Sequence, residues 1–354
     1  MRKKRKENTR SSIYDVAKHA GVSITTVSRV INNIPTVKEY NREKVSRAID
    51  ELGFSPDMNA RRLAGGRINT IGLVIPRFED MFYTFYVTEV LRGVCNTANE
   101  AGLDVLIHVT SRDMTDKKLG LHMENLSFCS GVIFADIQGN EKLIDSIVKE
   151  EIPCIVINHF DKGLDAGCIA IDNREGAVKA VDYLVSLGHE RIATITGELS
   201  IQAGRDRLEG YKDSLKKNGM KLDETLIKEC DFSPKRARLR ALELLDSGDY
   251  PTAIFVASDE MAAEVMRTLI GKKLRVPQDI SIVGFDDSWF ALQGALPLTT
   301  VKQPLALMAE RAVKNLRDAI SSRTKTAFKK DILATELVIR ESCVPPLKRE
   351  DLYS

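Results

Sequence analysis

Near the start of the chain, apolar residues recur every three or four positions in two short stretches separated by a glycine. The first stretch follows Ser12, and a serine with an acidic residue three positions later, here Asp15, is typical of a capped helix start. Gly21 supplies the backbone freedom that ends such a helix, and Ser23 can cap the next one. The pattern therefore predicts two short helices joined by a tight turn.

The two sides of the second predicted helix differ in chemistry. Val27 and Val30 lie on its apolar side, whereas the opposite side carries short residues around one long donor, Arg29. Short side chains let a helix approach base edges in the major groove of DNA, and an arginine can donate two hydrogen bonds to one guanine. The pattern indicates a DNA-reading helix–turn–helix unit, and the alternative is a helical hairpin whose polar face is only hydrated. The DNA contacts that we expect in this unit are Tyr14, Ser23, Ile24, Thr25, Thr26, Ser28, Arg29 and Asn32.

A third helical pattern, ended by Gly53, completes a predicted three-helix headpiece over residues 12–56, whose small core is marginally stable alone. In the following residues 57–67, Ala60 and Leu63 share one helical face beside two arginines. By itself, such a segment is a linker with a nascent helix, too short to be stable in water. Leu63 also suits a wedge that enters the minor groove while the arginines hold phosphates. We therefore expect Ala60 and Leu63 to contact DNA.

From residue 68 onward, short apolar runs alternate with helical patterns. The expected strands are residues 70–75, 104–108, 132–134, 154–157, 192–196, 253–256 and 280–283. The expected helices include residues 85–100, 141–150, 205–217, 234–245 and 259–271. Alternating strands and helices predict parallel sheets with helices on both faces. Two such runs predict two doubly wound α/β subdomains, with a ligand in the crevice beyond the carboxyl ends of the strands.

Charge is distributed unevenly along the chain. Residues 1–67 hold 15 Lys and Arg against 7 Asp and Glu, whereas the remaining residues hold 37 against 43, so a total of +2 divides into +8 and −6. A basic end on an acidic body is expected when only that end meets a polyanion. A chance basic tail does not explain it, because basic residues continue through the headpiece pattern. We expect residues 1–11 to be a disordered tail that adds salt-dependent affinity.

Composition is that of a globular protein, with 354 residues, 43% hydrophobic and 29% charged. No apolar run approaches the roughly 18 residues of a membrane span. The basic N-terminus is not followed by an apolar run either, so it does not resemble a secretory signal. We expect a cytoplasmic protein without a membrane partner.

Neither catalytic nor metal-binding patterns occur in the chain. The six cysteines are scattered singly, without a C-x-x-C pair or a histidine at ligand spacing, so we expect most of them to be small buried residues. Phosphate-binding and nucleophile-elbow motifs are missing. Asp286 and Asp287 are adjacent, and adjacent side chains in an extended segment point apart. We expect no enzyme activity, no cofactor and no metal.

Ordered motifs carry a resemblance to a known family. They include DVAKHAGVSITTVSRVIN, ELGFSPDMNARRLAGGR, TIGLVIP, IDNREGA, GRDRLEGY, ASDEMAAE, VPQDISIVGFDD and LTTVKQP. In these motifs the chain resembles the lactose and galactose repressor family of bacterial transcription regulators. The resemblance implies a small all-α helix–turn–helix headpiece followed by a periplasmic-binding-protein-like effector domain of two α/β subdomains.

The same resemblance sets the expected domain limits. The effector domain is expected over residues 68–345, with a tail at 346–354. Its N-subdomain is expected at about 68–167 and 300–327, and its C-subdomain at about 168–299 and 328–345. In this architecture the chain crosses between subdomains three times, and we expect the crossings near residues 166–169, 297–302 and 325–330.

The resemblance also implies an effector held between the subdomains. A sugar-like ligand needs planar polar side chains for its hydroxyls and an aromatic face to stack on. Arg207 and Asp286 match the charged residues that hold the effector, whereas Phe232 and Tyr83 have core packing as an alternative. Arg77 either holds an acidic group or faces solvent. The expected effector contacts are Phe82, Tyr83, Asn158, Ala203, Arg207, Phe232, Ser258 and Asp286.

Some positions depart from the family pattern. Asp80 and Met81 stand where relatives usually have Asn-Pro before the aromatic pair, so the local turn is expected to differ. Lys38 replaces the Ser or Thr that commonly caps the third helix, which weakens the cap by about 1 kcal/mol. Ala203 and Ser258 are smaller than the residues of some relatives and leave room for a bulkier ligand.

By resemblance, the chain is expected to be a repressor that binds a pseudo-palindromic operator as a homodimer. Its effector is expected to be a sugar or sugar phosphate, although nucleobases fit the same scaffold, and induction and corepression both stay open. The C-terminus has two prolines and no heptad run, so a dimer is expected rather than a tetramer. The alternatives are a regulator driven by a protein corepressor and a sugar-binding transport component, which would carry a signal peptide and lack the headpiece.

Overall fold

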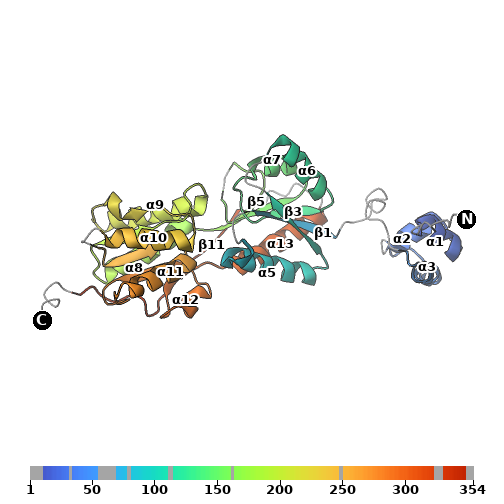
Figure 1. The fold of residues 1–354 in the computed structure, drawn as a ribbon. Coiled ribbons are helices and arrows are strands. Elements are labelled where there is room, and N and C mark those ends of the chain that lie inside the picture. The colour runs from blue at the N-terminus through green and yellow to red at the C-terminus, as the bar shows by residue number, and fades with distance from the viewer. Residues whose placement is uncertain are drawn as a thin grey trace, which may run out of the picture. The chain divides into compact units, whose positions relative to one another are not determined.

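The structure is a computed structural model that describes residues 11–31, 34–54, 69–77, 81–110, 115–160, 163–246, 250–322 and 330–347 (Figure 1). The chain divides into a headpiece unit, which ends at Thr70, and a larger body that holds nearly all later residues. The expected tails and the expected linker at residues 57–67 lie mainly outside the described residues.

The headpiece consists of three helices, α1 (Ile13–Ala20), α2 (Ile24–Ile31) and α3 (Glu39–Leu52). Apolar residues of all three helices meet in one core, and the fully buried ones are Val16, Val27 and Val45. This small core is the one that the helical spacing predicts, because each helix turns a single apolar stripe toward the other two.

The helix ends of the headpiece follow their local chemistry. The predicted capping box is present, since the amide of Asp15 donates to Ser12 Oγ at 3.3 Å and the amide of Ser12 donates to Asp15 Oδ2 at 2.8 Å. Gly21 ends α1 with a φ of 65°, a conformation that costs glycine little. At the start of α3, Lys38 makes no side-chain capping bond, which confirms the expected weak cap.

The body contains two six-stranded sheets, each of which forms one lobe. The first lobe has the strand order β11-β5-β4-β3-β1-β2. Its strands are β1 (Thr70–Pro76), β2 (Asp104–Thr110), β3 (Gly131–Phe134), β4 (Cys154–Ile157), β5 (Gly167–Ile171) and β11 (Lys330–Leu333). Its helices are η1 (Met81–Tyr83), α5 (Phe85–Glu100), α6 (Asp116–Leu126), α7 (Glu141–Lys149) and α13 (Leu305–Ser322), with α5 and α13 packed together below the sheet in Figure 1.

The second lobe has the strand order β12-β10-β9-β8-β6-β7. Its strands are β6 (Ile192–Ile195), β7 (Ile227–Lys228), β8 (Ala253–Val256), β9 (Ser281–Asp286), β10 (Thr299–Lys302) and β12 (Glu336–Val338). Its helices are α8 (Asn173–Ser186), α9 (Gln202–Lys217), η2 (Glu224–Leu226), α10 (Pro234–Leu245), α11 (Asp259–Gly271) and α12 (Phe290–Gln293). Strand β12 pairs antiparallel with β10, whereas the neighbouring pairs from β10 to β7 are parallel.

Strand β8 shows why the second sheet is buried on both faces. Ala253 and Phe255 belong to the core that includes residues of α8 and α9, whereas Ile254 and Val256 belong to the core that includes residues of α10 and α11. Successive side chains of a strand point to opposite faces, so a strand covered on both sides must be apolar throughout. The doubly wound architecture predicted from the sequence is therefore confirmed.

The three expected crossings between lobes occur, but each lies a few residues later than we expected. Strand β5 pairs with β4 and keeps the chain in the first sheet until Ile171. Strand β10 keeps it in the second sheet until Lys302, and β11 belongs to the first sheet until Leu333. The expected positions were a few residues too early because a short apolar strand at a lobe boundary has the same pattern in either sheet, and its pairing partner is distant in the sequence.

Candidate functional sites

The first candidate site is the exposed side of α2 in the headpiece. Ser23 caps this helix, since its Oγ accepts a hydrogen bond from the amide of Thr26 at 3.1 Å. Thr25 and Arg29 are exposed, and Ile24 is 41% exposed despite its apolar side chain. An exposed isoleucine beside short polar residues suits contact with a surface that is itself partly apolar, such as the methyl groups of thymine.

The remaining predicted DNA contacts fall into two groups. Tyr14 on α1 is 68% exposed, and Thr26 and Ser28 are half-buried on α2. Asn32, Ala60 and Leu63 lie outside the described residues. On α2, the buried residues are Val27 and Val30, and neither belongs to the predicted DNA-contact set. That the described members of the set contact DNA stays a prediction.

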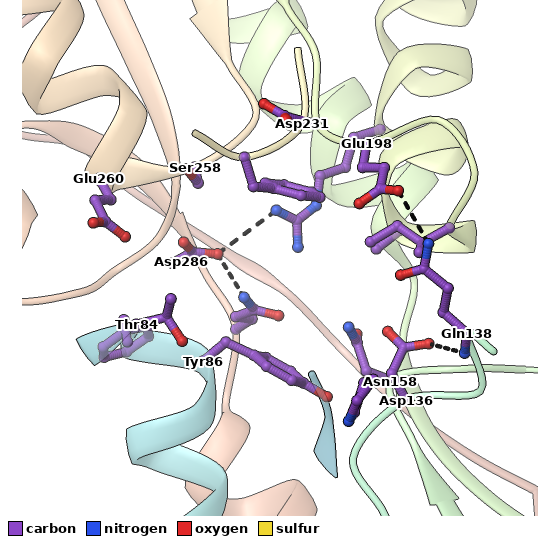
Figure 2. Close-up of a pocket in the computed structure, with 17 residues that line it drawn as sticks. Thr84, Tyr86, Asp136, Gln138, Asn158, Glu198, Asp231, Ser258, Glu260 and Asp286 are labelled. Atoms are coloured by element: carbon purple, nitrogen blue, oxygen red, sulfur yellow. Dashed lines mark hydrogen bonds and ion pairs between the residues drawn. The ribbon is translucent and has the colours of Figure 1, made fainter. Parts of the chain in front are cut away.

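The second candidate site is a cleft in the body with a volume of about 970 Å3, counted out to its open mouth. Residues of both lobes line it, many of them directly after a strand, as expected for the carboxyl ends of a doubly wound sheet. The lining residues are Pro76, Thr84, Phe85, Tyr86, Asp136, Gln138, Asn158, Glu198, Ile201, Ala203, Arg207, Asp231, Phe232, Ser258, Glu260, Asp286 and Gln303 (Figure 2).

Six of the eight predicted effector residues line this cleft. They are Asn158, Ala203, Arg207, Phe232, Ser258 and Asp286. The expectation that the other two face the cleft is wrong, because Phe82 and Tyr83 are 54% and 79% exposed and do not line it. The short helix η1 turns this pair outward, and Phe85 and Tyr86 at the start of α5 reach the cleft instead.

Arg207 is the central cation of the cleft, and its side chain is held from several sides. Its Nε donates to Asn173 Oδ1 at 2.9 Å, and its Nη1 donates to the carbonyl oxygen of Ala257 at 2.6 Å. Asp286 Oδ1 lies 3.6 Å from Nη1, and the guanidinium stacks 3.7 Å from the centroid of the Phe285 ring. Burial lowers the pKa of Arg207, and Asp286 opposes this effect.

Asp286 stands opposite Arg207 and is itself held by neighbours. Gln303 Nε2 donates to Asp286 Oδ1 at 2.5 Å, and both contacts of Asp286 are drawn in Figure 2. Burial raises the pKa of Asp286 to about 7, whereas Arg207 pulls it downward. Behind it, Asp259 accepts from Thr300 Oγ1 at 2.5 Å and from the amide of Ser288 at 2.8 Å. Asp259 therefore anchors the turn that follows Asp286 to strand β10.

Two buried amide oxygens in the cleft have no partner. Asn158 and Gln303 are 8% and 6% exposed, and Oδ1 of the first and Oε1 of the second accept no hydrogen bond. An unpaired buried acceptor costs roughly 1–3 kcal/mol. Such atoms in a ligand cleft are suited to accept hydrogen bonds from a bound molecule.

Three contacts join the two lobes near the cleft. Gln138, after β3, donates through Nε2 to Glu198 Oε1 at 3.0 Å, after β6 in the other lobe (Figure 2). Phe160 and Gln202 exchange two hydrogen bonds, of 2.9 Å to the amide of Phe160 and 3.2 Å to its carbonyl oxygen. The ring of Phe85 packs edge-on against Trp289, with 5.0 Å between centroids. The lobes therefore touch near the cleft through side-chain hydrogen bonds and one aromatic pair.

Sequence reasoning missed the acidic residues of the cleft. Asp136, Glu198, Asp231 and Glu260 all line it, and burial raises the pKa of Asp136 to about 6. Each of them comes soon after a strand, which is the available signal in the sequence. Surface carboxylates follow strands just as often, so the pattern alone does not single these four out.

Within the described residues, no helix is both long enough and apolar enough to cross a membrane. Among the same residues, no three His, Cys, Asp or Glu side chains are placed to hold a metal ion. Five of the six cysteines are buried, as predicted, and Cys95 is exposed.

Comparison with known proteins assigns both the headpiece and the body to known families. Residues 12–57 match the family model of bacterial regulatory proteins, lacI family, and residues 181–343 match a periplasmic binding protein-like domain. The HTH-type transcriptional regulator DegA of Bacillus subtilis (strain 168) is 35% identical over 340 residues, which cover 95% of this chain and 99% of that protein. The HTH-type transcriptional regulator CelR of Thermobifida fusca is 34% identical over 338 residues, or 94% and 98% of the two chains.

Solved structures show the same architecture. A complex of the transcriptional regulator CelR with cellobiose is 32% identical with a TM-score of 0.70, over 94% of this chain and all of that one. The lac repressor dimer bound to operator and the anti-inducer ONPF is 29% identical with a TM-score of 0.82, over 95% of this chain and all of that one.

A helix–turn–helix headpiece and a two-lobed α/β body with a ligand cleft define a class of DNA-binding transcriptional regulators. With relatives this similar over nearly its whole length, the chain belongs to the lacI family of bacterial regulatory proteins. Its relatives are transcriptional regulators, and the chain is a regulator rather than an enzyme.

Proposed function

We propose that this chain is a cytoplasmic repressor that binds operator DNA as a homodimer and changes its operator affinity when a small carbohydrate occupies the cleft. The observation that carries the proposal is the cleft itself, where a buried arginine, an opposing carboxylate and unpaired amide oxygens converge from two lobes. The CelR–cellobiose complex and the operator-bound lac repressor dimer support this proposal by similarity.

In the proposed DNA contact, Arg29 on α2 reads a guanine and the neighbouring Ile24, Thr25 and Thr26 set the fit to adjacent bases. Two headpieces of a dimer would then read the two halves of a pseudo-palindromic site. A ligand alters DNA binding only if it binds one arrangement of the protein better than another. In the proposed mechanism, the contacts between the lobes are the elements whose arrangement the ligand changes.

The experiment is an operator titration at fixed salt, with DNA from the region upstream of the protein's own gene and neighbouring genes. Sugars and sugar phosphates are added one by one. We expect one compound to shift the operator affinity, and the direction of the shift distinguishes an inducer from a corepressor. Specific DNA binding that no small molecule changes would contradict the carbohydrate-controlled mechanism and favour a protein corepressor.

The DNA-reading assignment is tested in the same titration with Arg29→Ala. We expect a loss of about 1–3 kcal/mol per half-site and a relaxed preference at one base pair, because one bidentate contact to a base is removed. Arg47→Ala on α3 is the matched control for loss of one positive charge. An equal loss of affinity for all DNA sequences would mean that Arg29 contacts phosphates and does not read a base.

A further inference from the structure

The charges that line the cleft are of mostly one sign. Five of the lining residues are carboxylates, namely Asp136, Glu198, Asp231, Glu260 and Asp286, and Arg207 is the one cation among the described lining residues. Figure 2 shows the labelled carboxylates on several sides of the cleft, contributed by both lobes. A cleft with surrounding walls focuses such a field onto its contents.

Arg207, the single cation, already interacts with other groups of the protein. Two donors of Arg207 are used by Asn173 and Ala257, and Asp286 Oδ1 lies 3.6 Å from its Nη1. Asp286 therefore offsets the positive charge of Arg207, and neutral protein oxygens occupy two of its donors before a ligand arrives. A second arginine, Arg236, pairs with Asp231 at 3.3 Å, but its side chain is 66% exposed and does not line the cleft. Surface pairs of this kind are screened by water.

The cleft also has a surplus of hydrogen-bond acceptors. These acceptors are the unpaired oxygens of Asn158 and Gln303, whose side chains are more than nine-tenths buried, whereas carboxylate oxygens of Asp136, Glu198 and Asp286 already accept hydrogen bonds from the protein. Hydroxyl groups donate to such acceptors, whereas phosphate and carboxylate groups of a ligand offer acceptors only. An anionic group on a ligand would therefore meet repulsion from the carboxylates, and where it replaces a hydroxyl beside a buried acceptor it would leave that acceptor without a donor.

From the lining charges and these unpaired acceptors, we infer that the cleft takes an uncharged, hydroxyl-rich saccharide and rejects its phosphorylated and carboxylated derivatives. This inference rests on the proposed function, because it names the chemical class of the proposed effector. It narrows the sequence-based expectation, which admits sugar phosphates.

The test measures binding of matched compounds to the full chain by isothermal titration calorimetry. The probes are glucose, galactose and cellobiose, each beside its 6-phosphate and its uronic acid. We expect at least one neutral saccharide to bind, and its anionic derivatives to bind at least about a hundredfold more weakly. An anionic derivative that binds as tightly as its neutral parent would overturn the inference.

Variants test whether the carboxylates cause the preference for neutral over anionic saccharides. In the triple variant Glu198→Gln, Asp231→Asn and Glu260→Gln, we expect the preference for the neutral compound to fall by about tenfold or more. Glu209→Gln is the matched control, because Glu209 is an exposed carboxylate on α9 that does not line the cleft. Thermal unfolding verifies that each variant is folded, and the single variant Asp231→Asn replaces the triple one if that chain does not fold. An unchanged preference in the folded variants would overturn the role of the carboxylates.

The outcomes separate this inference from the proposed function. A sugar phosphate that binds best and shifts operator affinity would refute the inference and leave a carbohydrate-controlled regulator. If none of the saccharides binds, the saccharide class itself is refuted for this cleft. Specific operator binding in the same preparation would then show that the DNA-binding part of the proposal stands.

Discussion

At the scale of single residues, three residues that line the cleft have unfavourable backbone conformations. Asn158, Phe232 and Asp286 have φ values of 63°, 63° and 130°, although none of them is glycine. Such conformations cost of order 1–3 kcal/mol each, and they persist where the surrounding structure holds them in place. All three residues line the cleft, so the strain coincides with the side chains that we propose to contact the ligand.

Phe232 depends on a glycine to keep its place. A Cβ atom added at Gly197 would lie 2.1 Å from the Cζ atom of the Phe232 ring. We therefore expect Gly197→Ala to push this ring aside and to weaken effector binding by about tenfold, because the aromatic face is lost as a stacking platform. Isothermal titration calorimetry with the effector measures the loss. Gly271→Ala is the control, since nothing lies within 4 Å of its added Cβ, and equal affinities for both variants would contradict the role of Phe232.

Asp136 makes stability depend on pH. Burial, with smaller contributions from the nearby Glu141 and Glu198, raises the pKa of Asp136 to about 6, although hydrogen bonds from the amides of Gln138 and Ile137 oppose the shift. A raised carboxyl pKa means that the folded chain binds the proton more tightly, so the contribution of Asp136 to stability is most favourable below about pH 4 and declines as the pH rises to about 6. We expect Asp136→Asn to stabilise the protein at pH 8 by on the order of 1–2 kcal/mol, with the gain vanishing near pH 4.

Thermal unfolding over this pH range, without effector, measures the difference. Asp279→Asn is a control of opposite sign, because a hydrogen bond from Arg275 lowers the pKa of Asp279. Its stabilising effect is present above the ordinary carboxyl pKa and is lost as the pH falls, so Asp279→Asn should destabilise at pH 8 and have less effect in acid. A constant gain from Asp136→Asn at every pH would mean that the carboxylate carries no burial cost.

The residue scale is also where prediction from the sequence worked unevenly. Arg207 and Asp286 were found because they stand in recognisable motifs, the first within α9 and the second at the end of β9, and the structure brings them together. The choice of Phe82 and Tyr83 failed because a one-turn helix and the capping residue Thr84 decide which aromatic side chains turn inward. Such a rotation depends on local packing and leaves no periodic pattern in the sequence.

At the scale of elements, periodicity and capping predict much of the structure. The expected helix at residues 85–100 agrees with α5 at both ends, and the expected strand at 253–256 agrees with β8. Strand β9 runs on to Asp286, beyond its expected end at residue 283, because Gly284 and the polar Asp286, which lines the cleft, interrupt the apolar run from which that end was predicted. Assignment of strands to sheets was less accurate, since pairing is a long-range property.

Helix α3 offers a prediction at this scale, because its cap is missing. Lys38 has extended backbone angles, φ −58° and ψ 140°, and makes no side-chain capping bond. Lys38→Ser should supply an acceptor for the first amides of α3 and stabilise the headpiece by about 1 kcal/mol. Amide hydrogen exchange of α3 in the full chain measures this gain. Arg47→Ser, which removes a positive charge from the exposed face of the same helix, should give no gain, and equal protection in both variants would contradict the capping argument.

At the scale of the whole molecule, the charge distribution favours DNA binding at one end of the chain, and the topology of the body forms the ligand cleft. The headpiece and linker region carries a formal charge of +8 and the remaining chain −6, so attraction to DNA is confined to one end. The body has two sheets joined by three crossings, with the cleft between them. Ligand binding in such a cleft is coupled to the arrangement of the lobes, and the two effects must be thermodynamically reciprocal.

The contact between Phe160 and Gln202 allows this coupling to be tested without touching the cleft, because neither residue lines it. Gln202→Ala removes two hydrogen bonds between the lobes, and each such bond contributes about 0.5–1.5 kcal/mol. If the effector favours joined lobes, we expect it to bind about three- to tenfold more weakly to this variant. Gln293→Ala, at an exposed glutamine of the second lobe, is the control.

Calorimetry with and without operator DNA completes the test. The factor by which the effector changes operator affinity must equal the factor by which the operator changes effector affinity, and this equality must hold in the wild type and in Gln202→Ala. A smaller factor in the variant would mean that the contact between the lobes carries part of the coupling. Weaker effector binding with an unchanged coupling factor would mean that the contact only stabilises the effector-bound arrangement of the lobes. DNA binding would then respond to another element.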